Sequence, residues 1–365
     1  MKPAKWFFII AAIYLIGYLS HALFLQKTVY GDGIFYYSWV RSIVVDRNIN
    51  FLNEYNHFGV TAEGNKHPIG SPLFWLPWYA QAHIIISKTG YELPYQLIVG
   101  LISVLAAISG LVLLFRLLLF HFSLTASILA VLSIAGTTNL LFYGSIDPVN
   151  SHAISFFAVT VFLSFLYSKN VSPFLTGCAL GFCALVRPQD AVLGLLAIPS
   201  LKRRGLLRLI FGAILVFSLQ LFAWNGLYGS PFVSPYLAGG ESFNWWSPHF
   251  FDVLFSPTNG LFLWTPITLL AIIGFRFWKD SRRVWFVTLF ILEVAIVASW
   301  SIWWQGASYS GRMLVSALPF LAFGLSALYG KLIILGLRWK SIMFAIIGPL
   351  TIINILLVIR FLLET

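Results

Sequence analysis

Apolar segments long enough to cross a lipid bilayer recur along almost the whole chain, and this pattern restricts the possible fold more than any other feature. Hydrophobic residues make up 59% of the 365 residues and charged residues only 10%, whereas soluble domains are roughly half apolar and a quarter charged. A window of about twenty residues, the length of a membrane-spanning helix, finds candidate spans at 6–25, 95–115, 124–142, 151–168, 172–186, 189–201, 208–226, 260–275, 284–303, 312–330 and 341–362. The sequence therefore predicts an all-α, polytopic integral membrane protein with about eleven transmembrane helices.

The segment 71–87 decides the predicted topology, because it is apolar but short and contains Pro72 and Pro77. Cytoplasmic loops carry an excess of Lys and Arg. If 71–87 does not cross the membrane, one face receives Lys2, Lys5, Arg116, Lys169, Lys202, Arg203, Arg204, Arg208, Arg276, Lys279, Arg282, Arg283, Lys331, Arg338 and Lys340. We therefore expect one transmembrane domain over 1–365, with a long extracytoplasmic loop at 26–94 that contains interfacial helices and a second large extracytoplasmic loop at 227–259.

The net charge of +11 follows from these topology-determining loops, so membrane lipids are the expected surroundings and nucleic acid is not an expected partner. Cys178 and Cys183 lie about 140° apart around one predicted helix and cannot form a disulfide with each other. His57, His67, His152 and His249 lack the helical spacing of a zinc motif such as HExxH. The sequence thus leaves the metal ligands unknown.

The segment 31–70 is the polar exception, with Asp32, Asp46, Glu54 and Glu63 among its residues. Ionisable groups gathered in one long loop of a membrane protein indicate chemistry at the water interface. The run GDGIFYYSWVRSIVV predicts a helix that begins at Asp32. Asp32 is then either the N-cap of this helix, a position that favours Asp, or a catalytic carboxylate. Asp46, Arg47 and Glu54 are expected to form a structural salt-bridge set.

Short loops on the same predicted face carry further ionisable groups, which we expect to converge on one pocket. A carboxylate there can take a proton from an attacking hydroxyl, and Lys or Arg can neutralise a phosphate. This combination favours transfer of a group carried on a lipid phosphate. The catalytic candidates are Asp32 and Asp147, and the candidates for binding the lipid phosphate or sugar are Lys66, His67, His152, Arg187 and Arg312.

Three further features have simpler interpretations. The aromatic residues of 227–259, such as Tyr236, Trp245 and Trp246, fit an interfacial aromatic belt better than a sugar-stacking surface. Glu241 and Asp252 in the same loop are expected to be solvated. Glu293 lies in an apolar span, where a carboxyl group needs a partner or a proton; it is either a structural pairing or part of a lipid pocket.

The arrangement resembles the GT-C superfamily of polyprenyl-phosphate-sugar-dependent glycosyltransferases, as in the protein O-mannosyltransferases and the lipid A aminoarabinose transferases. The resemblance rests on the N-terminal helix, the acidic GDG motif, the Lys-x-Pro-like element KHP, the second Asp at the end of a later span, and the segments LVRPQD, LYGSPFVSPY, LFSPTNGLFLWTP and WWQGASYSGR. It maps the acidic loop residue onto Asp32, the second Asp onto Asp147 and the lysine onto Lys66.

The resemblance implies an inverting transferase in the bacterial inner (plasma) membrane, with its active site on the extracytoplasmic face. The donor would be a polyprenyl-phosphate-linked sugar, and the acceptor a glycan, a lipid or a protein. Relatives often carry a second acid where this chain has Gly33, and His67 separates Lys66 from Pro68. These departures leave open whether a divalent cation, Mg²⁺ or Mn²⁺, belongs to the site.

A transporter or flippase of a lipid-linked sugar or another amphiphile is the alternative function. Transporters place ionisable groups near the bilayer midplane and are often built from structural repeats. In this sequence the predicted midplane holds little beyond Glu293, and no repeat is visible. The sequence therefore favours the transferase.

The topology can be tested with single cysteines at Ala62 and Lys88 in a background that lacks Cys178 and Cys183. If 26–94 is entirely extracytoplasmic, an impermeant thiol reagent labels both positions in intact cells. Protection at Lys88 alone would mean that 71–87 crosses the membrane, and every later loop would change side.

Overall fold

The protein is described by a computed structural model that covers residues 3–62, 64–168 and 170–364, and this part is mainly helical. The α-helices are α1 (Pro3–Leu25), α2 (Asp32–Arg41), α3 (Leu52–Phe58), α4 (Gly70–Ile86), α5 (Leu93–Leu119), α6 (Leu124–Thr137), α7 (His152–Leu166), α8 (Pro173–Val186), α9 (Arg203–Tyr228), α10 (Pro235–Ala238), α11 (Phe250–Phe255), α12 (Leu261–Trp264), α13 (Ile267–Gly274), α14 (Arg282–Ser299), α15 (Leu318–Ile334), α16 (Trp339–Ile342) and α17 (Gly348–Glu364). Short π-helical segments lie at Ser42–Asp46, Phe142–Ile146 and Met343–Ile347, and 3₁₀ segments at Pro188–Ala197, Phe275–Phe277 and Arg312–Ala317. An isolated antiparallel bridge joins Phe243 and Trp300.

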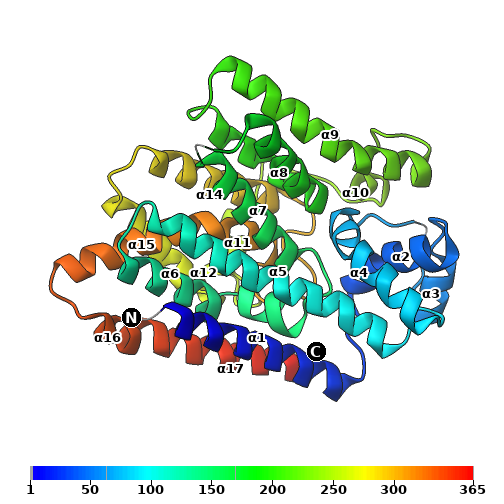
Figure 1. Ribbon diagram of the computed structural model, residues 1–365, viewed down its shortest axis with the longest axis horizontal. Helices are drawn as coiled ribbons and strands as arrows, with labels where there is room; N and C mark the ends of the chain where they lie inside the picture. The colour runs from blue at the N-terminus through cyan, green and yellow to red at the C-terminus, as the bar shows by residue number, and fades with distance from the viewer. Residues whose placement is uncertain (1–2, 63, 169, 365) are drawn as a thin grey trace.

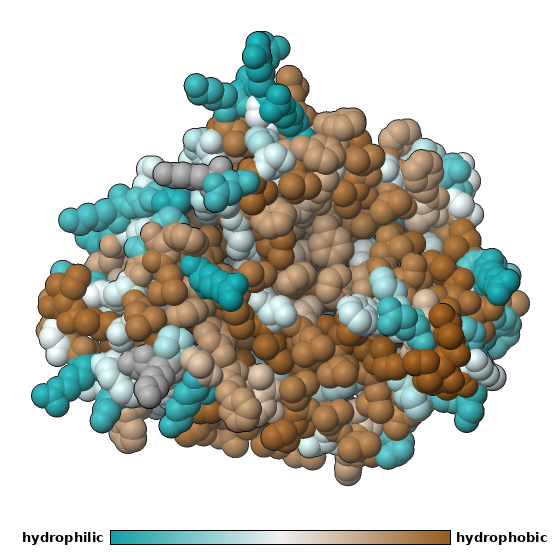
Figure 2. All heavy atoms as spheres, viewed as in Figure 1, coloured by the Kyte–Doolittle hydropathy of each residue, from teal (hydrophilic) through white to brown (hydrophobic). Residues whose placement is uncertain are grey.

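Helices long and apolar enough to cross a membrane confirm the integral membrane class. Among the described residues there are five, judged by length and composition: α1, α5, α9, the segment Arg312–Ile334 and the segment Trp339–Glu364. The apolar helices α6, α7 and α8 are shorter. The prediction of about eleven spans therefore stays a prediction. Hydrophobic residues cover most of the face shown in Figure 2, and hydrophilic residues gather mainly toward its margins.

Proline changes two of the predicted spans. The predicted helix 189–201 is a 3₁₀ segment, Pro188–Ala197, that begins at a proline. The predicted helix 260–275 is broken into α12 and α13, with Pro266 between them. Proline lacks the backbone N–H and clashes with the preceding turn, so it favours a break or a short irregular segment.

The helices pack in a series that follows the chain. Helix α1 packs on α5, α5 on α7, α7 on α8, and α8 on α9, and Figure 1 shows this succession from blue to green. The last pair is close because both helices carry glycine at the contact: a Cβ on Gly177 would lie 1.9 Å from the Leu209 carbonyl oxygen, and one on Gly212 would lie 2.3 Å from the Phe174 carbonyl oxygen. Small residues allow such backbone approach between membrane helices.

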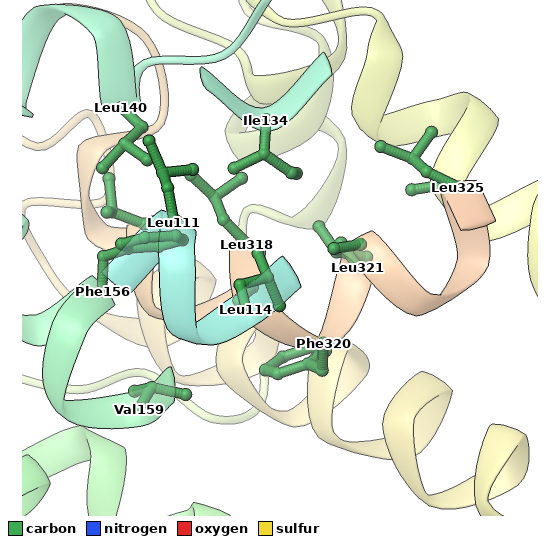
Figure 3. Packing of buried hydrophobic residues seen from close by; sticks show 14 of the residues in the cluster. Leu111, Leu114, Ile134, Leu140, Phe156, Val159, Leu318, Phe320, Leu321 and Leu325 are labelled. Carbon is green, nitrogen blue, oxygen red and sulfur yellow. The ribbon is translucent and has the colours of Figure 1, made fainter. Parts of the chain in front are cut away.

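Helix α15 forms the centre of the core. In the span Arg312–Ile334, 89% of the apolar window is buried, as expected for a helix that is hydrophobic on every side. Leu318 of α15 lies close to Leu111 and Leu114 of α5 (Figure 3). Because Arg312 begins the 3₁₀ turn that leads directly into α15, the core fixes the position of that arginine.

Helices α2, α3 and α4 of the first loop gather at one end of the molecule (Figure 1), where α2 packs on both of the others. Arg41 holds this loop together: its guanidinium forms ion pairs with Asp46 and with Glu54 at 2.9 Å, and stacks over the Tyr91 ring at 4.2 Å. The predicted structural role of Asp46 and Glu54 is confirmed. The predicted partner, Arg47, is wrong, because its side chain is exposed and its backbone ends the preceding turn at φ 56°.

Candidate functional site

One polar cavity of about 220 Å³ collects six of the seven residues singled out from the sequence. They are Asp32, Lys66, His67, His152, Arg187 and Arg312. They come from the start of α2, the loop before α4, the start of α7, the end of α8 and the turn before α15. The seventh residue, Asp147, does not line the cavity. The structure thus brings together segments far apart in sequence, and the chemical roles of the residues remain predictions.

Asp32 is paired with a cation and does not cap its helix. It is the first residue of α2, and the capping position belongs to Gly31, whose φ of 51° suits glycine and which makes no side-chain cap. One Asp32 carboxylate oxygen lies 2.8 Å from the Arg312 guanidinium, with 39% of the Asp32 side chain exposed. Burial opposes ionisation of Asp32, but the positive charges of Arg312 and Lys66 outweigh it and lower its pKa. Asp32 is therefore an ionised acceptor at neutral pH.

Gly33 has no room for a side chain. A Cβ at this position would lie 2.6 Å from the Val149 carbonyl oxygen, so the loop that carries Asp147 packs directly on the backbone of α2. This close approach explains why the chain has glycine where relatives often have a second acid.

Asp147 is half-buried and lies outside the cavity lining. Burial raises the pKa of Asp147 to about 7, and the negative charge of Asp32 adds to the shift, while Arg312, Asn150 and Tyr30 oppose it. The two carboxyl groups therefore have pKa values that are moved in opposite directions. Such a split assigns different protonation states to two neighbouring acids at neutral pH.

Arg187 is a buried cation with neutral partners, and only 4% of the residue is exposed. Its guanidinium donates to His152 Nδ1 at 3.2 Å, to the Met313 carbonyl oxygen at 2.9 Å and to the Arg312 carbonyl oxygen at 3.4 Å. Within the described part of the chain, no carboxylate lies at ion-pair distance from Arg187. Because a buried charge is costly without a counter-ion, the lack of a carboxylate in contact agrees with the prediction that Arg187 binds a phosphate. The buried Asp190 acts on Arg187 electrostatically without contact.

The contact with Arg187 also fixes the state of His152. A guanidinium only donates hydrogen bonds, so His152 Nδ1 must accept. The ring is then neutral, with its proton on Nε2.

His67 is neutral for a different reason. It is buried and stacks on the Phe35 ring, with centroids 4.9 Å apart and an angle of 17°. Burial lowers the pKa of His67 to about 4. At neutral pH it can therefore offer hydrogen bonds to a ligand but no charge.

A second buried polar layer lies beneath these residues. Ser155 donates to Asp190 at 2.8 Å, and Ser316 donates to Glu293 at 3.2 Å, and all four side chains are fully buried. Three of the four lie three or four residues after a cavity residue of the same segment. The layer connects the segments that form the cavity floor, and it favours structural pairing as the role of Glu293.

Lys66 is paired with Glu241, a residue that the sequence analysis expected to be solvated. Its ammonium forms an ion pair with Glu241, and the other Glu241 oxygen accepts a hydrogen bond from Trp300 Nε1 at 2.6 Å. Only 9% of Glu241 is exposed, so the expectation that it is solvated is wrong. Asp252 matches that expectation, since 45% of its side chain is exposed beside His249.

An apolar groove of about 520 Å³ adjoins the cavity. The two share walls formed by Pro188, Gln189, Tyr236, Trp300 and Met313. The groove continues along Trp224, Phe232, Val233, Pro235, Phe243, Trp245, Ile296 and Val297.

Some aromatic residues of the second large loop line the groove, and others are exposed. Tyr236 and Trp245 line it, whereas Trp246 is 97% exposed, as expected for an interfacial belt. The sequence analysis assigned Tyr236 to an interfacial belt and did not single out Trp300, because uncharged aromatic residues are common throughout a membrane protein.

The arrangement does not fit a metal centre. Across the described ranges, no group of three or more His, Cys, Asp and Glu side chains is placed to hold a metal ion. Asp32 is paired with Arg312, and the neighbouring position is Gly33, packed against a carbonyl oxygen.

Comparison with known proteins supports the fold. The chain matches no protein-family model and no curated protein sequence. Among solved structures it is similar to the crystal structure of the oligosaccharyltransferase from Archaeoglobus fulgidus, a complex with Zn and sulfate, with a TM-score of 0.51 and 15% sequence identity over 95% of this chain. The match spans 52% of that protein's length. The likeness shows a shared fold.

The raised pKa of Asp147 predicts a specific pH dependence of stability. The folded state keeps a proton on Asp147 up to about pH 7, whereas the unfolded state loses it near pH 4. Folding stability from this group therefore falls as the pH rises from about 4 to about 7 and then levels off. Thermal unfolding of wild type and Asp147→Asn between pH 5 and pH 8 should show a steeper loss of stability in wild type. Parallel curves would contradict the buried, proton-holding state of Asp147.

Proposed function

We propose that this protein is a glycosyltransferase that moves a sugar from a polyprenyl-phosphate donor to an acceptor on the extracytoplasmic side of the membrane, with inversion. The observation that carries the proposal is the junction of a cationic cavity with an apolar groove through shared walls at Tyr236 and Trp300. An anionic head and an apolar tail on one molecule would fill both compartments. A lipid-linked sugar phosphate has this chemistry, and a glycosyltransferase fold supports the assignment.

The cavity offers a distinct place for each part of the donor. Arg187 lies on the cavity wall beside Pro188 and Gln189, which also line the groove. A phosphate at Arg187 would therefore lie at the boundary, with the polyprenyl chain in the groove and the sugar directed toward Asp32. Charge-assisted hydrogen bonds to a guanidinium are the strong kind and suit a phosphate.

The reaction needs one bond formed and one broken. The acceptor oxygen attacks the anomeric carbon, and the bond from that carbon to the phosphate oxygen breaks, so the polyprenyl phosphate leaves with both electrons. The acceptor proton passes to Asp32, which is ionised at neutral pH because of Arg312. Its lowered pKa makes Asp32 a weak base, so it orients the hydroxyl and receives the proton late, when the attacking oxygen has become acidic. A single displacement inverts the configuration.

The proposal is tested by incubating the purified protein with labelled polyprenyl-phosphate sugars and candidate acceptors, and measuring released polyprenyl phosphate. Acceptor-dependent release with formation of a labelled glycoside supports it. Movement of the donor across vesicles without release would identify the transporter instead.

Asp32→Asn should reduce the transfer rate by at least about a hundredfold, the usual scale of general acid and base contributions, with donor binding largely kept. Because the Asp32 side chain does not cap α2, this change does not remove a helix cap. Thermal unfolding of the same preparation checks that the loss is not one of folding. Full activity of a well-folded Asp32→Asn protein would exclude a catalytic role.

Arg187→Ala should reduce kcat/KM by roughly a hundredfold or more, because charge stabilisation of a leaving group is typically worth about 3 kcal/mol. Arg47→Ala, at an exposed arginine of the first loop, is the matched control and should leave kcat/KM unchanged. Equal activity of the two variants would remove Arg187 from the phosphate site.

A further inference from the structure

Of the three positive side chains that line the cavity, two are in ion pairs and the third, Arg187, is not. Arg312 is paired with Asp32, and Lys66 is paired with Glu241. Arg187 makes hydrogen bonds to neutral groups and has no ion-pair partner among the described residues, although the buried Asp190 acts on it electrostatically without contact. The two histidines are neutral. Counting the side chains that line the cavity or are paired with one that does, three positive and two negative charges remain, and the difference is one positive charge.

Glu241 contributes to this balance from outside the predicted catalytic set. It lies on the segment after α10, and that segment runs along the end of α14 through backbone hydrogen bonds: Asn244 donates to the Ser299 carbonyl oxygen at 2.6 Å, and Ser301 donates to the Ser242 carbonyl oxygen at 2.8 Å. Trp300 holds the second carboxylate oxygen at 2.6 Å. The carboxylate is thus fixed beside Lys66 by the backbone on either side of it.

We propose that Glu241 is a specificity-determining residue that sets the charge class of the lipid headgroup. By neutralising Lys66, it limits the cavity to one positive side chain without an ion-pair partner and so selects a headgroup with a single phosphate over a diphosphate. This inference rests on the proposed function, because it assumes that a lipid phosphate occupies the cavity.

The same balance bears on release of the product. A sugar phosphodiester carries one negative charge and matches the cavity, whereas the free polyprenyl phosphate that leaves is a monoester with about 1.5 to 2 negative charges at neutral pH. The more highly charged product is attracted to a positive cavity more strongly than the donor is. By neutralising Lys66, Glu241 reduces this attraction and favours release. Like charges placed together across a binding interface act against the wrong partner, and Glu241 supplies that repulsion.

The test compares the affinities of polyprenyl monophosphate and polyprenyl diphosphate of equal chain length for purified protein in nanodiscs. In Glu241→Gln the ratio of the two dissociation constants should move toward the diphosphate by at least about tenfold. Lys66→Gln combined with Glu241→Gln restores the wild-type net charge, so its ratio should return toward the wild-type value. A purely structural role of Glu241 does not predict this return.

Asp252→Asn is the matched control, because it removes a carboxylate from the same loop at an exposed position outside the cavity. Its ratio should equal that of wild type. An unchanged ratio in Glu241→Gln, an equal shift in Asp252→Asn, or a double variant that stays at the Glu241→Gln value would each overturn the charge role while leaving the proposed function standing. Failure of wild type to bind either lipid would instead refute the proposed function, and this inference with it.

Discussion

The ion pair between Asp32 and Arg312 is the contact on which the candidate site depends, because it joins the first loop to the start of the buried helix α15. Asp32 begins the first helix of the long loop, and Arg312 begins the turn that enters the buried helix α15. Through this ion pair the buried helix α15 fixes the position of the start of α2 in the first loop. Lys66 and His67 follow in the same loop and are brought over the ends of α7 and α8.

Burial of charge explains the spacing of the polar residues. In an apolar surrounding, each ionisable group needs a partner, and the structure supplies these partners from different segments. Arg41 takes Asp46 and Glu54 within the first loop, while Lys66 reaches Glu241 from the second large loop. The first pairing closes the loop on itself, and the second ties it to the wall of the groove. Arg187, without a carboxylate partner among the described residues, is the exception that marks a place for a ligand.

Much of this architecture could be predicted from the sequence, because apolar length and basic loops report directly on helices in a membrane. The helical fold, the helix that begins at Asp32 and the convergence of Lys66, Arg187 and Arg312 all follow from residue type and predicted sidedness. The number of membrane spans is harder to predict from the sequence. Two of the eleven predicted spans are short or broken, at Pro188 and Pro266.

The partners of the charges could not be predicted, because pairing depends on which loops meet in space. Sequence distance favours Arg47 as the partner of Asp46, but the side chain of Arg47 is exposed and Arg41 forms the ion pair. Glu241 carries no signal of burial in a loop rich in aromatic residues. The glycine at position 33 is visible in the sequence, but the reason for it is not. The reason is the carbonyl oxygen of Val149, a residue more than a hundred positions later in the chain, which leaves no room for a side chain.

The opposite pKa shifts of Asp32 and Asp147 follow from one geometric difference. Both carboxyl groups are under the influence of Arg312, but only Asp32 is in direct contact with its guanidinium and open to the cavity. Asp147 lies outside the cavity lining, where burial and the charge of Asp32 together favour the protonated form. In the proposed reaction Asp32 is therefore the carboxylate that meets the acceptor hydroxyl. Its low basicity suits a displacement in which the bond to the phosphate oxygen breaks before the proton is transferred. A stronger base in its place would be protonated by neutral water more often and would hold the Arg312 ion pair less firmly. The contact that fixes the architecture thus also sets the proton chemistry available to the site.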